Sequence, residues 1–227
     1  DATITRAARA DAERIRAVET LEDQARMFAS LPEGSEVRYL TDVIRERSRG
    51  PRLRLPFQPA TLEAAWALGV RYYDVAPWYG FGLAERRFGH FLHTQKRDEY
   101  VLSSKVGKLF RASQHNRHAE IFPFSDSPND LIIDYTADGV RRSIDDSLQR
   151  LGVSHLDVVF VHDLSPDFAW FPTGWEEQYE IARTGAFPAL SKLRDEGGGR
   201  AWGVGVNTPY AILKVIEDAD PDVCLCA

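Results

Sequence analysis

Residues 61–92 read TLEAAWALGVRYYDVAPWYGFGLAERRFGHFL, and this stretch decides the fold class. Its first part has the pattern of a helix that ends at Gly69, and its centre, residues 70–76, has that of a buried strand. Its last part predicts a second helix over residues 83–94. A strand between two helices is the repeating unit of parallel α/β folds. Asp74 stands inside the apolar strand, which raises the question of what a carboxylate does there.

The same alternation continues along the rest of the sequence. Strands are predicted over residues 99–106, 155–163, 200–207 and 222–227, and helices over residues 135–152, 187–197 and 209–219, with Thr136 as an N-cap. Apolar strands separated by helices predict a parallel sheet that is covered on both faces. Two architectures have this pattern, a doubly wound sheet and a (β/α)8 barrel. A doubly wound sheet normally has a glycine-rich turn directly after its first strand, whereas GVGV at 203–206 lies within a strand, so the barrel is favoured.

The first 54 residues differ in composition from the rest of the chain. They are rich in Arg, Glu, Asp and Ala and contain no lysine, and their apolar spacing predicts helices over residues 11–31 and 36–50. Because the charges balance and form no basic stripe, we interpret these helices as a packed or oligomerising appendage. The chain therefore divides into a charged helical segment at 1–54, of unassigned role, and a barrel-like part at 55–227.

The composition bounds the class of protein and its partners. With 44% hydrophobic residues and a net charge of −6, the chain of 227 residues has no overall positive charge to attract nucleic acid or an anionic membrane. No charged and then apolar leader opens it, and no apolar run approaches the roughly 18 residues of a membrane span, so we expect a cytoplasmic location. Cys224 and Cys226 fall on one face of one strand, which favours two buried, reduced thiols. A homo-oligomer stays open.

Polar residues stand at the ends of four consecutive strands. Each interrupts or directly follows an apolar run: Asp74 and Tyr79 in YYDVAPWYG, Lys105 in VLSSKVG, His162 in FVHD and Asn207 in GVGVN. A single residue of this kind is more often half of a structural ion pair. In parallel α/β folds, however, the carboxyl ends of the strands meet at one edge, and functional groups gather there. Four strands that all end in this way therefore predict one site.

These residue types together suit proton transfer. An unperturbed phenol has a pKa of about 10, which is too high for easy proton exchange at neutral pH. A neighbouring ammonium favours the phenolate, and a carboxylate holds that ammonium charged and in place. Tyr79, Lys105 and Asp74 fit this arrangement. A histidine at the same point can orient a carbonyl or hydroxyl oxygen, and the Asn207 amide is suited to pair with another amide.

The order Asp, Tyr, Lys, His on successive strands resembles the aldo-keto reductase superfamily, and the similarity runs from about residue 61 to residue 227. That resemblance implies a (β/α)8 barrel and an oxidoreductase that transfers hydride between NADP or NAD and a carbonyl. It implies that Tyr79 is the general acid or base and that Asn207 binds the nicotinamide carboxamide. The implied catalytic tetrad is Asp74, Tyr79, Lys105 and His162.

Two further sequence motifs narrow the class of substrate that the resemblance implies. VHDLSP at 161–166 and RTGAFPALSKLRDEG at 183–197 most resemble sugar dehydrogenases of the D-threo-aldose or L-fucose type and pyridoxal dehydrogenases, which oxidise a ring hemiacetal to a lactone. The implied partner is thus a small carbonyl or sugar substrate, and Tyr79 would act as a base on its hydroxyl. Trp78, beside Tyr79, is a candidate for stacking on the substrate. Further rings crowd the segment after His162, where a packed loop would use them equally well: Phe168, Trp170, Phe171 and Trp175.

No metal site is expected. The histidine pairs in HFLH at 90–93 and HNRH at 115–118 have the spacing of neighbours on a helix, but a zinc site needs a third ligand and an ordered frame. We interpret these histidines as solvated or capping residues. Residues 107–135 form a long connection at the edge where the functional residues gather, and connections of this kind usually shape access to a site.

Parts of the family pattern have no counterpart in the sequence. RLRLPFQP at 52–59 stands where the family has its opening strand and glycine-rich turn, and DVCLCA at 222–227 precedes two strands that carry the family's sites for the cofactor phosphates. Five strands are therefore evident. Three explanations are open: a longer chain, a remodelled barrel closed by the helical segment or a partner, or a non-catalytic interaction protein that has lost the cofactor site. We favour the first, because an unclosed sheet leaves exposed edges.

Overall fold

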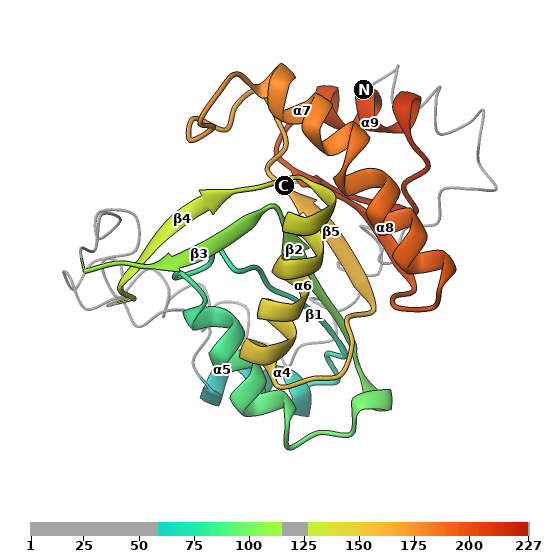
Figure 1. Ribbon diagram of the computed structural model, residues 1–227. Helices are drawn as coiled ribbons and strands as arrows, with labels where there is room; N and C mark the ends of the chain where they lie inside the picture. The colour runs from blue at the N-terminus through green and yellow to red at the C-terminus, as the bar shows by residue number, and fades with distance from the viewer. Residues whose placement is uncertain (1–58, 115–126, 227) are drawn as a thin grey trace.

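The computed structural model describes residues 59–114 and 127–226, and the predicted alternation of strands and helices is present in them (Figure 1). The helices predicted over residues 11–31 and 36–50, the division at residue 54 and the histidines of HNRH lie outside the described residues.

Five parallel strands form the main sheet. They are β1 (Tyr72–Asp74), β2 (Val101–Val106), β5 (Val158–His162), β6 (Ala201–Val206) and β7 (Val223–Cys226). The strands lie side by side in the order in which they occur along the chain, and every neighbouring pair is parallel. A doubly wound sheet reverses its strand order at a switch point, whereas a barrel does not. The observed order is therefore that of the predicted barrel.

Helices connect the strands, as parallel crossovers require. The helices are α4 (Pro59–Ala67), α5 (Leu83–Leu92), α6 (Ala137–Leu151), α7 (Trp175–Thr184), α8 (Ala186–Asp195) and α9 (Pro209–Asp218), with one 3₁₀ turn at Arg97–Glu99. Helix α6 packs between α5 and α8 and lies against β2, while α8 and α9 lie against β6 (Figure 1). Helix α7 was not predicted, because the aromatic residues that precede it are equally compatible with a packed loop. It buries Tyr179 and Ala182 and packs against α8.

Local sequence signals explain how α5 and α6 are held. The predicted N-cap Thr136 accepts a hydrogen bond from the backbone N–H of Gly139 at 3.0 Å, which satisfies a free donor at the start of α6. Gly89 lets α5 approach the end of α6, because a Cβ there would lie 2.5 Å from the carbonyl oxygen of Leu151. The buried carboxylate of Glu85 then joins the two helices through the Arg150 guanidinium at 2.5 Å. These contacts fix the helices behind β1 and β2.

The long connection predicted at 107–135 contains a second sheet. Strands β3 (Lys108–Ala112) and β4 (Asn129–Ile133) pair antiparallel and extend away from the main sheet (Figure 1). Gly107 separates β2 from β3 and has φ +97°, a conformation that glycine adopts without strain. The first residue of β3 is thus brought directly beside the carboxyl end of β2.

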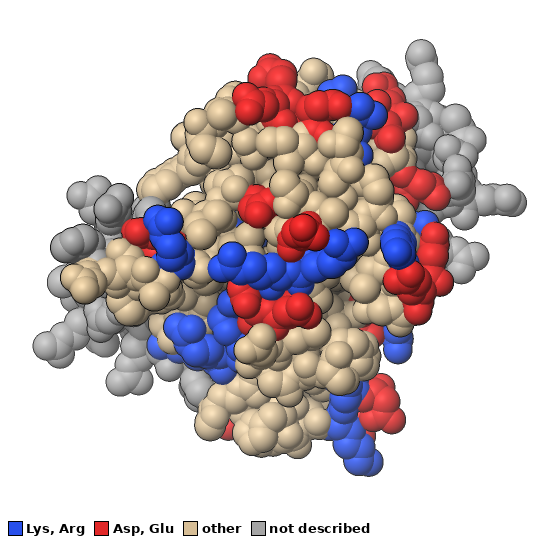
Figure 2. Space-filling view, in the orientation of Figure 1, with Lys and Arg blue, Asp and Glu red and all other residues tan. Residues whose placement is uncertain are grey.

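The surface carries charges of both signs. Figure 2 shows Lys and Arg side chains in a band with Asp and Glu on either side of it. Ion pairs such as Arg141–Asp138 at 2.8 Å contribute to this mixture. Cys224 and Cys226 are exposed on β7, so the expectation that both thiols are buried is wrong: β7 is an edge strand of the sheet formed by the described residues. In that part of the chain, no helix is long and apolar enough to cross a membrane.

Candidate active site

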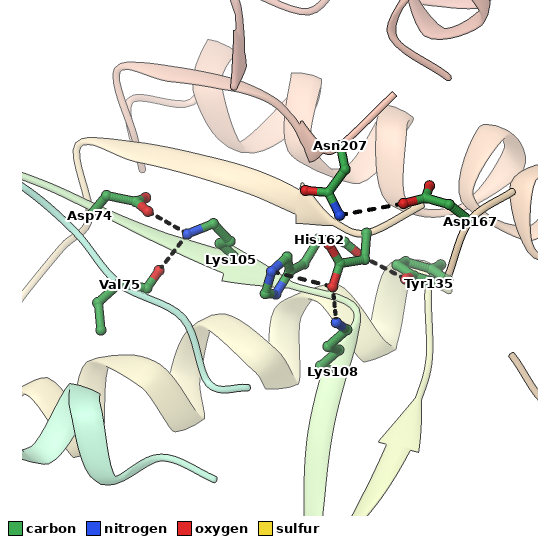
Figure 3. Close-up of polar contacts among 9 residues, drawn as sticks. Asp74, Val75, Lys105, Lys108, Tyr135, His162, Asp167 and Asn207 are labelled. Carbon is green, nitrogen blue, oxygen red and sulfur yellow. Dashed lines mark hydrogen bonds and ion pairs between the residues drawn. The ribbon is translucent and has the colours of Figure 1, made fainter. Parts of the chain in front are cut away.

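The ends of the parallel strands bring four predicted residues to one edge of the main sheet (Figure 3). Asp74 ends β1, Lys105 is the second-last residue of β2, His162 ends β5, and Asn207 directly follows β6. The strand register explains their proximity. Asp74 lies opposite Ser103, two residues before Lys105 on β2, and Lys105 lies opposite Phe160, two residues before His162 on β5. Side chains that are widely separated in the sequence are therefore neighbours in space.

The Lys105 side chain is buried and paired. Its ammonium, with 2% of the side chain exposed, forms an ion pair with the Asp74 carboxylate and donates to the carbonyl oxygen of Val75 at 3.2 Å. The second carboxylate oxygen of Asp74 accepts a hydrogen bond from the Ser103 hydroxyl at 2.6 Å. Tyr72 and Ser103 are in turn 3.0 Å apart through their hydroxyl oxygens. This network satisfies the carboxylate that the core strand carries and fixes the ammonium at the strand edge.

A tight turn directs Tyr79 towards that ammonium. After Pro77, the residues Gly80, Phe81 and Gly82 have φ values of +62°, +52° and +81°, so the chain turns sharply. The half-buried Tyr79 ring lies with its centroid 4.8 Å from Nζ of Lys105. Its centroid is 5.7 Å from that of the His162 ring, and the two planes meet at 88°. The structure thus brings Asp74, Lys105, Tyr79 and His162 together, as the sequence predicted.

The His162 imidazole is kept neutral. Only 5% of the residue is exposed, and burial, followed by the positive charges of Lys108 and Lys105, holds the pKa of His162 well below its usual range. Its Nε2 lies 3.5 Å from a carboxylate oxygen of Asp163. Its Nδ1 is buried and has no hydrogen-bond partner among the described residues. A neutral ring of this kind can orient a ligand oxygen without adding a full positive charge.

Asn207 is exposed at the same edge. Its amide nitrogen donates to the Asp167 carboxylate at 3.4 Å (Figure 3). That carboxylate also accepts a hydrogen bond from the Ser165 hydroxyl. The loop after His162 therefore limits the rotation of the Asn207 amide. An oriented carboxamide can pair with a second carboxamide, such as that of nicotinamide. No group of three His, Cys, Asp or Glu residues in the described ranges could hold a metal ion.

Trp78 lies in a group of aromatic rings beside the site. Its ring centroid is 5.3 Å from that of Phe81, 5.8 Å from that of Trp170 and 6.4 Å from that of Phe168. Trp170 is 43% exposed, so this group reaches the surface. Of the four rings in the segment after His162, Phe168 and Trp170 pack beside Trp78, whereas Phe171 and Trp175 pack against Tyr135 and Tyr179.

Three residues near His162 were not predicted. The ammonium of Lys108, which is fully buried, pairs with the carboxylate of Asp163, and the Tyr135 hydroxyl donates to the carbonyl oxygen of His162 at 2.7 Å (Figure 3). Asp163 directly follows His162 in FVHD, and Lys108 lies three residues after Lys105 in SSKVGK; this nearness in the sequence was the only local signal for them. The site is therefore supported from β3 and β4 as well as from the main sheet.

Sequence comparisons with known proteins agree on one protein family. A family model described as the aldo/keto reductase family matches residues 52–225. The chain is 40% identical over 172 residues to a D-threo-aldose 1-dehydrogenase from a Pseudomonas species, covering 74% of this chain and 49% of that protein. It is 36% identical over 187 residues to a pyridoxal 4-dehydrogenase from Microbacterium luteolum, covering 74% of this chain and 51% of that protein. The chain thus spans about half the length of these relatives.

Solved structures match the fold. An aldo-keto reductase from Bacillus halodurans superposes with a TM-score of 0.53 at 20% identity, over 72% of this chain and 45% of that one. A glycerol dehydrogenase from Gluconobacter oxydans gives a TM-score of 0.52 at 24% identity, over 73% of this chain and 43% of that one. At such low identity the likeness concerns the fold alone. It confirms the predicted assignment of these parallel strands and helices to the α/β barrel class.

Proposed function

This chain belongs to the aldo/keto reductase family, as its motifs predicted, and on that premise we propose that it carries the catalytic groups of an NAD(P)-dependent oxidoreductase. The proposed substrate is the carbonyl or ring hemiacetal of a sugar-like or pyridoxal-like molecule, in line with the names of the two relatives. The observation that carries the proposal is the paired, buried ammonium of Lys105, 4.8 Å from the centroid of the Tyr79 ring.

In this proposal Tyr79 exchanges a proton with the substrate oxygen. In the oxidative direction the phenolate accepts the proton of the substrate hydroxyl, and in the reductive direction the phenol donates it. Lys105 stabilises the phenolate electrostatically, and its ion pair with Asp74 holds the ammonium in place. His162, neutral and buried, orients the same oxygen by a hydrogen bond. When bound, the nicotinamide cofactor would exchange a hydride with the substrate carbon.

The residues at the strand edge fit the nicotinamide end of such a cofactor. The exposed amide of Asn207 is oriented by Asp167 and suits a carboxamide partner. The buried Nδ1 of His162, without a partner among the described residues, is a further polar atom that a ligand at this edge could satisfy. We assign no residue of the described ranges to the phosphate end, and both NADP and NAD stay within the proposal.

The wider organisation is proposed on the same basis. The family match begins at residue 52, which supports a division near residue 54 between the helical segment and the barrel-like part. Trp78 and its ring neighbours, beside Tyr79, are the proposed contact surface for the apolar face of the substrate. A cytoplasmic enzyme that acts on a small molecule remains our expectation.

The proposal is tested with the full-length protein and a panel of aldoses and pyridoxal. We expect the absorbance of reduced nicotinamide to rise with one of these substrates and NADP or NAD, and the rate to depend on Tyr79. Titration calorimetry with the two cofactors separates this function from that of a non-catalytic interaction protein. Absence of both turnover and cofactor affinity would exclude the enzyme and favour the interaction protein.

A further inference from the structure

A second buried lysine lies beside the candidate tetrad. The Lys108 side chain has no exposed surface, and its Nζ lies 4.1 Å from the centroid of the Phe168 ring and 4.6 Å from that of the Trp78 ring. An ammonium that loses its water in this way needs a negative partner. The Asp163 carboxylate provides it through Oδ2. Lys108 is therefore held by one ion pair and by two aromatic faces that come from different loops.

The same carboxylate oxygen also faces the imidazole. Oδ2 of Asp163 lies 3.5 Å from Nε2 of His162, so one oxygen atom stands between the Lys108 ammonium and the histidine ring. Asp163 reaches this position because its φ is +51°, a conformation that is uncommon for residues other than glycine. Its backbone N–H donates to the carbonyl oxygen of Gly205 at 2.8 Å, which holds this conformation against β6.

The backbone at His162 is supported from the same end of the small sheet, where Lys108 lies opposite Ile133. The hydroxyl of Tyr135, directly beyond β4, donates to the carbonyl oxygen of His162 at 2.7 Å. The backbone N–H of Asp134 donates to the carbonyl oxygen of Gly107 at 3.0 Å, which closes the base of the β3–β4 sheet next to Lys108. Two elements outside the main sheet thus converge on one strand end.

We propose that Lys108 is a positioning residue of this active site, which acts through Asp163 to fix the orientation and the neutral state of the His162 ring. The inference rests on the proposed function, since it gives His162 a role in the reaction. It goes beyond the tetrad, because Lys108 does not touch the reacting atoms in this arrangement. Lys108, the first residue of β3, thereby links the β3–β4 sheet to the active site.

Burial is the main cause of the neutral state of His162, and the charges that face the ring reinforce it. Lys108 and Lys105 both disfavour the imidazolium, and they offset the Asp163 carboxylate, which alone would favour it. Without the Lys108 ammonium, Asp163 would stand unpaired beside the ring. The carboxylate would then favour a protonated His162, so the pKa of the ring would rise, although burial would still oppose the charge.

The test replaces Lys108 by methionine in the full-length protein labelled with ¹⁵N-histidine. Nuclear magnetic resonance then follows the titration of the His162 ring nitrogens, with the His162→Phe variant to assign the signals. In the Lys108→Met variant we expect the pKa of His162 to rise by about one unit or more. Lys214→Met is the matched control, because Lys214 also pairs with a carboxylate, that of Asp218 at 3.2 Å, and lies 4.6 Å from the centroid of the Tyr179 ring.

A second variant keeps the test decisive if Lys108→Met does not fold. Asp163→Asn has nearly the same shape, and asparagine tolerates a positive φ well. The carboxylate oxygen 3.5 Å from Nε2 favours the tautomer with a proton on Nε2. We expect Asp163→Asn to weaken this preference, so that both neutral tautomers of His162 give signals. An unchanged His162 titration in folded Lys108→Met, or an unchanged tautomer in Asp163→Asn, would overturn the proposal.

Kinetics separates this inference from the proposed function. If the wild-type protein turns over its substrate, we expect Lys108→Met to lower kcat by about tenfold with little change in the KM of the cofactor, and Lys214→Met to leave both unchanged. If the wild-type protein is inactive, the proposed function fails, whereas the resonance measurements still decide whether Lys108 controls the His162 ring.

Discussion

The Nζ atom of Lys105 lies 4.8 Å from the centroid of the Tyr79 ring, and Asp74 pairs with the same ammonium from the neighbouring strand. The backbone thus places the carboxylate, the ammonium and the phenol next to one another. Strands β1 and β2 are adjacent, and the turn after Pro77 leads the chain back towards them. Asp74 is accommodated in a core strand because both of its carboxylate oxygens are satisfied, by Lys105 and by Ser103.

Tyr79→Phe removes the hydroxyl and keeps the ring. If this phenol exchanges the proton, kcat should fall by about 10²–10⁴-fold while the far-ultraviolet circular dichroism stays unchanged. Tyr73→Phe is the matched control, since it removes a phenol from β1, the strand before the Tyr79 turn, and the Tyr73 hydroxyl donates to the carbonyl oxygen of Val70 at 3.0 Å. Steady-state assays that follow the absorbance of reduced nicotinamide measure kcat for both variants. Full activity in Tyr79→Phe would remove Tyr79 from the mechanism.

Asp74→Asn leaves the Lys105 ammonium without its carboxylate. The lysine side chain is 2% exposed and would keep the Val75 carbonyl oxygen at 3.2 Å as an acceptor, so we expect a loss of about 1–3 kcal/mol in the free energy of unfolding. Urea denaturation measures this loss. The exposed pair Lys96–Glu99, 3.6 Å apart, supplies the control Glu99→Gln, which should change the stability by less than about 0.5 kcal/mol. Equal losses in the two variants would contradict the structural role of Asp74.

The strand-end residues could be predicted because each one interrupts an apolar run. Asp74, Lys105 and His162 are polar residues within strands whose other positions are mostly buried, and parallel strands bring their carboxyl ends to one edge. Thr136 and Gly152 mark the ends of α6 by capping chemistry that is local in the sequence. Signals of this kind depend only on periodicity and on neighbouring residues.

The support of the site from β3 and β4 depends on contacts between distant segments. A lysine that follows a glycine after a strand is usually exposed, and the burial of Lys108 requires Trp78, Phe168 and Asp163 to meet around it. The antiparallel pairing of β3 with β4 was likewise not evident within the long connection. Local patterns do not specify which loops meet, so these features could only be seen in three dimensions.

Asn207→Ala should weaken cofactor affinity. Loss of the carboxamide removes one or two hydrogen bonds to a bound nicotinamide, so the Kd should rise about three- to tenfold. Titration calorimetry measures this change directly and does not depend on turnover. The control is Asn129→Ala on β4, which removes an amide that donates to the Ser127 hydroxyl at 2.6 Å. This variant should leave the Kd unchanged. An unaltered Kd in Asn207→Ala would contradict the proposed cofactor contact.

Gly107→Ala should be strongly destabilising. The glycine has φ +97°, and a Cβ there would overlap the Tyr135 ring, whose hydroxyl supports the carbonyl oxygen of His162. Backbone strain and overpacking together should lower the free energy of unfolding by about 2–4 kcal/mol. Gly152→Ala is matched in conformation, with φ +66°, but a Cβ there has open space and should cost only about 1 kcal/mol. Chemical denaturation compares the two, and similar losses would exclude the steric explanation.

Lys108 should give the protein a pH-dependent stability at alkaline pH. Burial is the main cause that lowers the pKa of Lys108 from 10.5 to about 8, partly offset by Asp163. Below about pH 8 the folded and unfolded states both hold this proton, whereas between that pH and the unfolded value only the unfolded state does. The free energy of unfolding should therefore rise with pH in this range, by an amount on the order of 3 kcal/mol when complete.

The Lys108→Met variant isolates this contribution. Other groups titrate in the same range, and Tyr135 acts in the opposite direction because burial raises its pKa, so that the unfolded chain loses the phenolic proton first. These groups are common to both proteins and largely cancel in the difference. Urea denaturation from about pH 7 to about pH 10 should show the wild-type protein gaining stability relative to Lys108→Met as the pH rises. A constant difference over this range would mean that the buried ammonium keeps its proton.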